Sequence, residues 1–327
     1  MTIRTIGLAT AMALVASAAH AAPAPRNFAV ADAPVTEDRF PVQAVVFPGG
    51  VKAYRDVAYQ QLPGYIPQVV DVYVPATKGP HPLVLYIHGG GWVGGHTRHS
   101  GALANFPAVL AQLAAEGFTV ASLEYRLSGE AKFPAQLQDA KAALRFLGDH
   151  AAQYKIDAKR VGIWGGSAGG HLTALTALTC GNTALDPKAD KDICATAAVT
   201  WYGVFDFDAL VASRPGGADD AAVRLMGCKD ACTPEQLAIA SPVTYIDAKD
   251  PPFLLIHGDD DKVVPVGQSH LAEARMRAAG VPVEAIYIPG VDHSFIGKTP
   301  AETRAATIKA TNATFDFFHA KLGVVRK

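Results

Sequence analysis

The chain has 327 residues, with 29 lysines and arginines against 30 aspartates and glutamates, and a formal net charge of -1. This balance argues against nucleic-acid binding, which needs a clustered basic surface. A hydrophobic content of 50% with only 18% charged residues excludes an intrinsically disordered chain. Its 4 cysteines are too few for a disulfide-built scaffold. What remains is a globular protein, long enough to bury a sizeable core.

The N-terminal 21 residues have the pattern of a secretory signal peptide. Arg4 supplies a positive charge, residues 6–19 are mostly apolar and small, and an A-x-A site ends at residue 21. The apolar run falls short of the roughly 20 residues that span a bilayer, so a membrane helix is disfavoured. We therefore expect a periplasmic or extracellular protein with no membrane span. Residues 22–40, rich in Ala and Pro, are expected to form a flexible leader.

Export changes how the cysteines are interpreted. Four cysteines allow three pairings, and the local ones, Cys180–Cys194 and Cys228–Cys232, close the shortest loops and suit an oxidising compartment. A zinc site is disfavoured, because the chain has no C-x-x-C pair and no histidine near the second pair. We expect two local disulfides and no metal.

Predicted strands and helices alternate from residue 68 onward. Strands are predicted at residues 68–74, 83–87, 118–123, 160–164, 195–201, 253–257 and 283–288. Helices are predicted at 103–116, from 134 through 147, from 168 onward and at 301–322. Continuous apolar strands mean that both sheet faces are covered, and the alternation indicates a parallel sheet. We expect a single α/β domain over residues 41–327, with the irregular stretch 209–241 as a candidate cap.

A candidate nucleophile lies where the strand at 160–164 runs into Gly-Gly-Ser-Ala-Gly at 165–169. G-x-S-x-G between a strand and a helix is typical of a nucleophile elbow, with Ser167 exposed at the helix N-terminus. A phosphate-binding loop would need a lysine after the last glycine, but Gly170 and His171 follow. The pattern therefore favours Ser167 as a nucleophile.

A second glycine motif, His-Gly-Gly-Gly-Trp at 88–92, directly follows the strand at 83–87. Its side-chain-free amides can approach a developing oxyanion. Together with the amide of Ala168, those of Gly90 and Gly91 would form an oxyanion hole. His88 lies at the strand end, so we expect it to fix the loop rather than to act as a base.

A serine nucleophile needs a base held by a carboxylate, and in this motif order the acid precedes the histidine. His293 follows the last predicted strand and is the candidate base. Aspartates 259–261 follow the strand at 253–257, and Asp206 follows the one at 195–201, so spacing alone does not choose among these acids. Histidines 96, 99, 171 and 257 are less suited by position. The candidate loops all lie at strand carboxyl ends, where open α/β sheets place their sites.

These motifs together resemble the α/β-hydrolase esterases, in particular the bacterial hormone-sensitive-lipase-like and feruloyl/acetylxylan-esterase groups. The resemblance rests on HGGGW at 88–92, GGSAGG at 165–170, HGDDDKVVP at 257–265 and DHSF at 292–295, with EYRLSGEAKFPAQLQD at 124–139 matching as well. It covers roughly residues 51–319. One departure is Ser128-Gly129-Glu130, where relatives often carry a proline; we expect only a local loop change there.

The resemblance implies an α/β-hydrolase fold, with a mostly parallel central sheet flanked by helices and a small cap insertion. It also implies Ser167 as nucleophile, His293 as base, and Gly90, Gly91 and Ala168 as oxyanion donors. The H-G-x-x-D-x-x-V-P form of the acid loop assigns the acid to Asp261. We therefore expect a secreted serine esterase without a cofactor, acting on short-chain, acetylxylan or feruloyl esters, either small or polysaccharide-linked.

Two alternatives stay open at this point. A serine peptidase or formamidase-like amide hydrolase would use the same triad. A non-catalytic hydrolase-fold binding protein is also conceivable, although the intact set of Ser, His and Asp argues against it. Four aromatic residues are candidates for the substrate pocket, while buried aromatics also serve as plain core; they are Trp92, Tyr125, Trp201 and Tyr202.

Overall fold

The computed structural model describes residues 44–213, 220–229 and 231–325. The signal peptide and the leader expected at residues 1–40 lie outside the described residues, as does a part of the expected cap. The described residues belong to one compact unit, Pro41–Lys327. No helix in these described ranges is long and apolar enough to cross a membrane.

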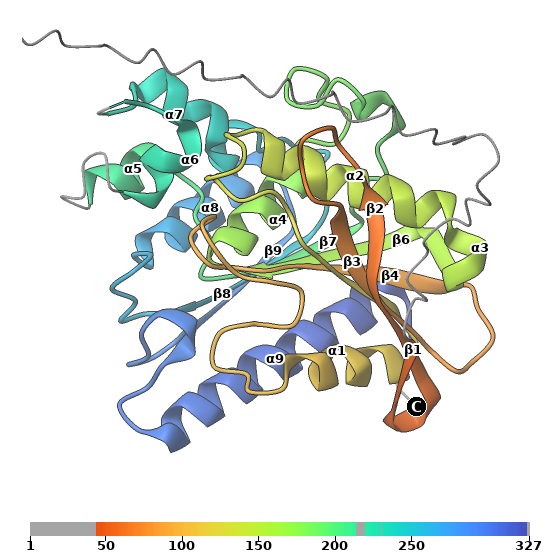
Figure 1. The fold of residues 1–327 in the computed structure, drawn as a ribbon. Coiled ribbons are helices and arrows are strands. Elements are labelled where there is room, and N and C mark those ends of the chain that lie inside the picture. The colour runs from red at the N-terminus through yellow and green to blue at the C-terminus, as the bar shows by residue number, and fades with distance from the viewer. Residues whose placement is uncertain (1–43, 214–219, 230, 326–327) are drawn as a thin grey trace, which may run out of the picture. The chain divides into compact units, whose positions relative to one another are not determined.

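The described chain builds a nine-stranded sheet in the order β1-β2-β3-β5-β4-β6-β7-β8-β9 (Figure 1). The pairs β1–β2, β2–β3 and β3–β5 are antiparallel. The pairs β5–β4, β4–β6, β6–β7, β7–β8 and β8–β9 are parallel. The predicted α/β class with a mostly parallel sheet is therefore confirmed. The strands are β1 (Ala44–Phe47), β2 (Val51–Gln60), β3 (Gln68–Val74), β4 (His81–Ile87), β5 (Thr119–Leu123), β6 (Ile156–Gly166), β7 (Ala197–Trp201), β8 (Phe253–Gly258) and β9 (Val283–Ile288).

The sequence patterns found the central strands and missed the N-terminal edge. β1 and β2 were not predicted, although β2 alternates buried Val51, Ala53, Val57 and Tyr59 with more exposed residues. That alternation is typical of an antiparallel strand near an edge, and it lacks the continuous apolar run by which the central strands are recognised. β6 is longer than predicted and extends to Gly166, so it delivers the chain directly to Ser167.

Helices cover both faces of the sheet (Figure 1). On one face α1 and α9 share a buried cluster with Tyr86 and Trp164, and on the other α2, α4 and α8 share one with Leu85 and Ile163. Asn105 caps α1, so this helix begins later than predicted. The bounds are α1 (Phe106–Ala115), α2 (Ala135–Asp149), α3 (Ala151–Tyr154), α4 (Ala168–Leu178), α8 (Gly267–Ala279) and α9 (Pro300–Leu322).

The stretch predicted as an irregular cap is largely helical where it is described. α5 (Phe207–Ala212), α6 (Ala221–Met226) and α7 (Pro234–Ala240) pack against one another. A capping box at the start of α7 joins Thr233 and Gln236, a local sequence signal that marks where this helix begins. Each of the three helices begins after a residue whose side chain caps it, namely Asp206, Asp220 and Thr233.

The four cysteines form the two local disulfides that were expected. Cys180–Cys194 closes the loop between α4 and β7, and Cys228–Cys232 closes the turn between α6 and α7. The Cys180–Cys194 loop also carries Asp192, whose carboxylate lies 2.7 Å from Lys141 Nζ and 2.7 Å from Arg145 Nη1, both on α2. This loop is therefore held by a covalent link and by a buried ion network.

Candidate active site

The elbow at Ser167 is a tight, strained turn between β6 and α4. Ser167 has φ 57° and ψ -123°, a backbone conformation that residues with a side chain rarely adopt. Its N–H donates to the carbonyl of Trp201 at 2.9 Å, which ties the turn to β7. A Cβ at Gly169 would overlap the carbonyl oxygen of Ile87. The small residues around the serine are therefore required by the close approach of β4.

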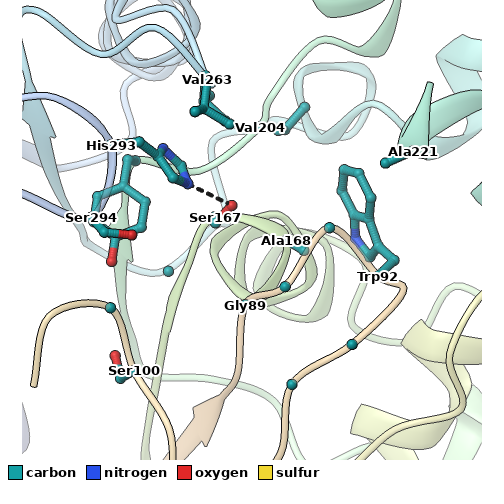
Figure 2. Close-up of a pocket in the computed structure, with 18 of the residues that line it drawn as sticks. Gly89, Trp92, Ser100, Ser167, Ala168, Val204, Ala221, Val263, His293 and Ser294 are labelled. Carbon is teal, nitrogen blue, oxygen red and sulfur yellow. Dashed lines mark hydrogen bonds between the residues drawn. The ribbon is translucent and has the colours of Figure 1, made fainter. Parts of the chain in front are cut away.

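A continuous chain of hydrogen bonds runs from Ser167 through His293 to Asp261 (Figure 2). The Nε2 atom of His293 lies 3.0 Å from Ser167 Oγ, and its Nδ1 atom lies 2.8 Å from Asp261 Oδ2. The three residues follow β6, β8 and β9, so they meet at the carboxyl edge of the parallel strands. The structure thus brings together the three residues that the motifs singled out.

The carboxylate of Asp261 is buried and fully engaged. Its Oδ1 accepts from the N–H groups of Val263 and Val264, each at 2.8 Å, and its Oδ2 also lies 3.3 Å from His257 Nε2. Burial by itself would raise the pKa of Asp261, but hydrogen bonds from His257 and His293 hold that pKa well below its usual range. The group therefore stays ionised at neutral pH.

The competing acids have other partners. Asp259 accepts from the N–H of Gly290 at 2.7 Å, and Asp260 pairs with Lys262. Asp206 caps α5 by accepting from the N–H of Ala209 at 3.1 Å. None of these interactions involves the His293 ring, so among the acids considered Asp261 is the one placed to orient it.

The glycine loop lies against the elbow. A Cβ at Gly89 would come within 2.8 Å of the Gly166 carbonyl oxygen, and one at Gly90, which has φ 118°, would overlap the Gly94 carbonyl. The ring of His88 stacks on Tyr125 at 4.3 Å, and its Nδ1 atom lies 2.7 Å from the carbonyl oxygen of Gly89. Burial lowers the pKa of His88 to about 4, so this side chain is neutral and braces the loop.

A second buried histidine links the glycine loop to the cap helices. Trp92 donates through Nε1 to Nδ1 of His171 at 3.2 Å, which leaves Nε2 of His171 to donate to the Ala240 carbonyl at 2.7 Å. Burial lowers the pKa of His171 to about 4. His171 on α4 is therefore a neutral connector between the loop and α7, and its position in the sequence gave no hint of this.

Ser167 and His293 lie on the wall of a cavity of about 690 Å³ that also contains the backbone of the glycine loop (Figure 2). Its size suits a small organic ligand. The lining side chains that bear a hydroxyl group are Tyr86, Ser100, Ser167, Tyr202 and Ser294. The apolar ones are Trp92, Ala168, Val204, Leu210, Ala221, Val263, Val264 and Ile296.

Of the four aromatic residues proposed for the pocket, Trp92 and Tyr202 line this cavity and Tyr125 and Trp201 do not. Tyr125 is buried behind the glycine loop, where its hydroxyl donates to the His88 carbonyl at 3.0 Å. Trp201 is directed into the core and donates through Nε1 to Thr314 Oγ1 on α9 at 2.9 Å. These two side chains are therefore placed in the core and not on the wall of this cavity.

The arrangement has the elements of acyl transfer. It combines a hydroxyl nucleophile, an imidazole in contact with it, a buried carboxylate that orients the imidazole, and glycine-rich backbone beside the reacting atom. Among the described residues no group of three or more His, Cys, Asp or Glu side chains is placed to hold a metal ion.

The curated relatives of the chain carry esterase names. The probable carboxylic ester hydrolase LipM of Mycobacterium tuberculosis is 32% identical over 220 residues, which is 66% of this chain and 50% of that protein. Esterase LipC of the same organism is 31% identical over 66% of this chain and 53% of that protein. The chain thus spans about half the length of these relatives.

Solved structures match over more of their own length. A truncated carbohydrate esterase from gut microbiota superimposes with a TM-score of 0.70 at 29% identity, over 83% of this chain and 96% of that one. A thermophilic esterase, Est2, of Thermogutta terrifontis gives a TM-score of 0.67 at 26% identity, over 85% and 94% respectively. The BD-FAE family model matches residues 70–276. The resemblance to α/β-hydrolase esterases is thereby confirmed, and the chain belongs to the BD-FAE family.

Proposed function

We propose that the protein is a serine hydrolase that cleaves carboxylic esters through an acyl-enzyme. One observation carries the proposal: the hydrogen-bonded chain Ser167–His293–Asp261 ends with the serine hydroxyl on the wall of an accessible cavity. The esterase names of the curated and structural relatives support the same chemistry.

In the acylation half-reaction Ser167 Oγ attacks the ester carbonyl carbon while His293 Nε2 removes the hydroxyl proton. Negative charge collects on the former carbonyl oxygen, where the N–H groups of Gly90, Gly91 and Ala168 stabilise it. The Asp261 carboxylate holds the tautomer with the proton on Nδ1 and stabilises the imidazolium. The imidazolium then protonates the departing alcohol, and the acyl group remains on Ser167.

Deacylation repeats these steps with water. His293 removes a proton from the water molecule, the resulting oxygen nucleophile attacks the acyl carbon, and the Ser167 oxygen leaves with a proton from His293. The carboxylic acid is released and the serine hydroxyl is restored. No cofactor takes part in this sequence.

The substrates we propose are esters with a short or aromatic acyl group attached to a carbohydrate, such as acetylated or feruloylated xylan. One structural neighbour is a carbohydrate esterase, and Est2 of Thermogutta terrifontis has structures with propionate or butyrate bound. Export to the periplasm or beyond accords with the signal-like N-terminus and the two disulfides.

Labelling and turnover together test the proposal. The wild-type protein should react with an organophosphonate probe at Ser167 and hydrolyse 4-nitrophenyl acetate, while Ser167→Ala should do neither at an unchanged melting temperature. A panel of acetyl, butanoyl, octanoyl and feruloyl esters, with a matched anilide of each acyl group, defines the preference. Faster cleavage of the anilides than of the matched esters would show that the protein is an amide hydrolase instead. An unlabelled wild-type protein would support the binding-protein alternative.

A further inference from the structure

We propose that a basic groove beside the active-site cavity binds an anionic group at the far end of the leaving alcohol, so that the protein prefers esters whose alcohol carries a carboxylate or a similar anion. The groove is lined by residues 102–104, residues 296–300 and the first turns of α9. The inference rests on the proposed ester hydrolysis and adds a recognition site outside the cavity that contains Ser167.

The basic groove is a cavity of about 520 Å³ that continues from the active-site cavity along the same two segments of chain. Residues 99–101 line the active-site cavity, and the residues that follow them, 102–104, line the groove. In the second segment Ile296, which is 44% exposed, lines both cavities. The two segments approach each other closely, since a Cβ at Gly101 would lie 3.5 Å from the Cβ of Ser294. A molecule bound at the nucleophile therefore reaches the groove by extending past Ile296.

Two cationic side chains, Lys298 and Arg304, line the basic groove, and no aspartate or glutamate does so in the described part of the chain. Both are exposed, and neither side chain forms an ion pair or a hydrogen bond with any residue in the described ranges. By contrast, Arg277 on α8 is paired with Glu273. The groove thus carries two positive charges that the described protein does not neutralise.

Glu302, the acid nearest to these cations in the sequence, is engaged elsewhere. Its Oε2 accepts from the N–H of Thr299 at 2.9 Å, as part of the capping box that begins α9. It lines a separate cavity together with Lys309. Lys298 borders that cavity as well, whereas Arg304 does not. Within the basic groove itself the charge of Arg304 is therefore available to a ligand.

Hydrogen bonds within the walls hold the basic groove in shape. The N–H of Gly297 donates to Thr303 Oγ1 at 2.9 Å, and Thr303 Oγ1 donates to the carbonyl of Thr299 at 3.2 Å. On the other wall the N–H of Leu103 donates to the carbonyl of Ser100 at 3.0 Å. None of these bonds uses the two cations. Because the walls are already ordered, a ligand loses less free energy on binding to them.

The distribution of charge along the two cavities defines the chemistry of the ligand. No Lys, Arg, Asp or Glu side chain lines the active-site cavity in the described part of the chain. Leu103, Ile296 and Ile308 add apolar surface to the groove, and the cations lie there as well. The matching ester is uncharged around the scissile bond and carries an anion at a distance from it. A guanidinium group and an ammonium group both suit a carboxylate.

The position of the base assigns the anionic end to the alcohol rather than to the acyl group. The departing alcohol oxygen must receive its proton from His293 Nε2, so the alcohol lies beside that ring. The segment that begins at His293 passes through Ser294 and Ile296, which line the active-site cavity, and then forms the wall of the basic groove. The alcohol is thus the part of the ester directed toward Lys298 and Arg304.

The test uses acetates of ω-hydroxy acids, from 4-hydroxybutanoate to 10-hydroxydecanoate, and the acetates of the corresponding ω-hydroxy amides. Each amide matches its acid in length and lacks the charge. We expect the wild-type protein to have a higher kcat/KM for the acid than for the amide once the chain is long enough to reach the basic groove. The difference should lie in KM, because the anion is remote from the reacting atoms and binds equally well in the ground state and the transition state.

Neutral substitutions in the basic groove should remove this preference. Lys298→Gln and Arg304→Gln should each lower the ratio of kcat/KM for acid over amide about threefold, and the double variant about tenfold. Lys309→Gln is the matched control, because it removes a positive charge from α9 outside the groove and should leave the ratio unchanged. Added salt should reduce the ratio in the wild-type protein and not in the double variant, since exposed charges are screened.

Three results would contradict the proposal at different levels. A ratio near one at every chain length, or a preference that survives in the double variant, would overturn the basic groove as an anion site while leaving ester hydrolysis intact. If the preference appears instead with 4-nitrophenyl monoesters of dicarboxylic acids, which carry the anion on the acyl group, the assignment to the alcohol is wrong. A wild-type protein that cleaves neither the acids nor the amides refutes the proposed function itself.

Binding without turnover provides a second measurement. Ser167→Ala should bind the preferred acetoxy acid in titration calorimetry, and the further changes Lys298→Gln and Arg304→Gln should weaken this binding about tenfold. The corresponding amide should bind equally to both proteins. Equal affinities of the two proteins for the acid would count against an anion site in the basic groove.

Discussion

Arg98 donates two hydrogen bonds to the buried carboxylate of Asp71, from Nε to Oδ2 at 2.8 Å and from Nη2 to Oδ1 at 3.0 Å. Asp71 lies on β3 and is completely buried, whereas Arg98 belongs to the loop between the glycine motif and Ser100. The pair thus fixes the loop that forms one wall of the cavity to the antiparallel part of the sheet.

Replacing Arg98 by Lys should therefore loosen this wall. Lysine keeps the charge but cannot form the planar two-pronged contact. We expect the free energy of unfolding to fall by about 1–2 kcal/mol, and kcat/KM to fall several-fold through poorer placement of the loop. Urea denaturation and steady-state kinetics measure both effects. Arg277→Lys, in an exposed pair with Glu273 on α8, is the control and should change stability by less than about 0.5 kcal/mol.

Asp261→Asn should preserve the fold and remove most of the activity. Asparagine can donate to His293 Nδ1 and so favour the tautomer that cannot accept the serine proton, for which losses of about 10⁴-fold in kcat are typical. Steady-state kinetics with 4-nitrophenyl acetate measure the loss. Asp206→Asn, at the cap of α5, is the matched control and should retain activity. Comparable losses in the two variants would contradict the assignment of the acid.

Gly90→Ala should disable the glycine loop. The added Cβ would overlap the Gly94 carbonyl oxygen at a positive φ, so the loop must shift away from Ser167. Loss of one oxyanion donor typically lowers kcat by about 10²–10³-fold. Gly129→Ala is the control, because a Cβ there meets open space. Near-normal kcat in Gly90→Ala would mean that this amide does not contact the oxyanion.

The buried histidines predict acid sensitivity of the fold. Burial lowers the pKa values of His88 and His171 to about 4, from about 6.5 in an unfolded chain. Between about pH 4 and 6.5 the unfolded state binds more protons than the folded state does. The contribution of these histidines to the free energy of unfolding is therefore fully present above about pH 6.5 and is lost as the pH falls toward 4. Each histidine should contribute roughly 1 kcal/mol per pH unit between pH 6 and 5.

Chemical denaturation at pH 7, 6 and 5 measures this slope. His171→Gln should make the slope shallower by roughly 1 kcal/mol per pH unit, since glutamine does not titrate. Asp261 affects stability at lower pH, because its pKa is lowered in the folded protein. Its contribution to the free energy of unfolding is present above about pH 4 and is lost below that. An unchanged slope in the glutamine variant would show that His171 is not the group responsible.

Removing the disulfide between Cys180 and Cys194 should destabilise the fold without affecting turnover. The cysteines are 14 positions apart, for which chain entropy predicts about 3 kcal/mol. The double Cys→Ala variant should lose that amount in urea denaturation and keep its kcat, because the loop is remote from Ser167. A loss well below 1 kcal/mol would indicate that the Lys141–Asp192 ion pair already holds the loop.

Local sequence determined much of this protein. The elbow and the glycine loop are recognisable because their constraints are local: a tight turn and a close backbone approach admit few residues besides glycine, as at Gly169 and Gly90. The central strands are recognisable because both faces are buried, which leaves an uninterrupted apolar run. From these patterns the fold class and the candidate residues Ser167 and His293 follow.

Tertiary structure decided what depends on neighbours distant in the sequence. Trp201 and Tyr202 are adjacent aromatics, yet the first packs into the core against α9 and the second lines the cavity, because the chain leaves β7 between them with a positive φ at Tyr202. Likewise, spacing alone left several aspartates open as partners of His293, and only the packing of the loops after β8 and β9 places Asp261 within 2.8 Å of its Nδ1. Side-chain direction and contact arise from three-dimensional packing, which residue type and spacing do not encode on their own.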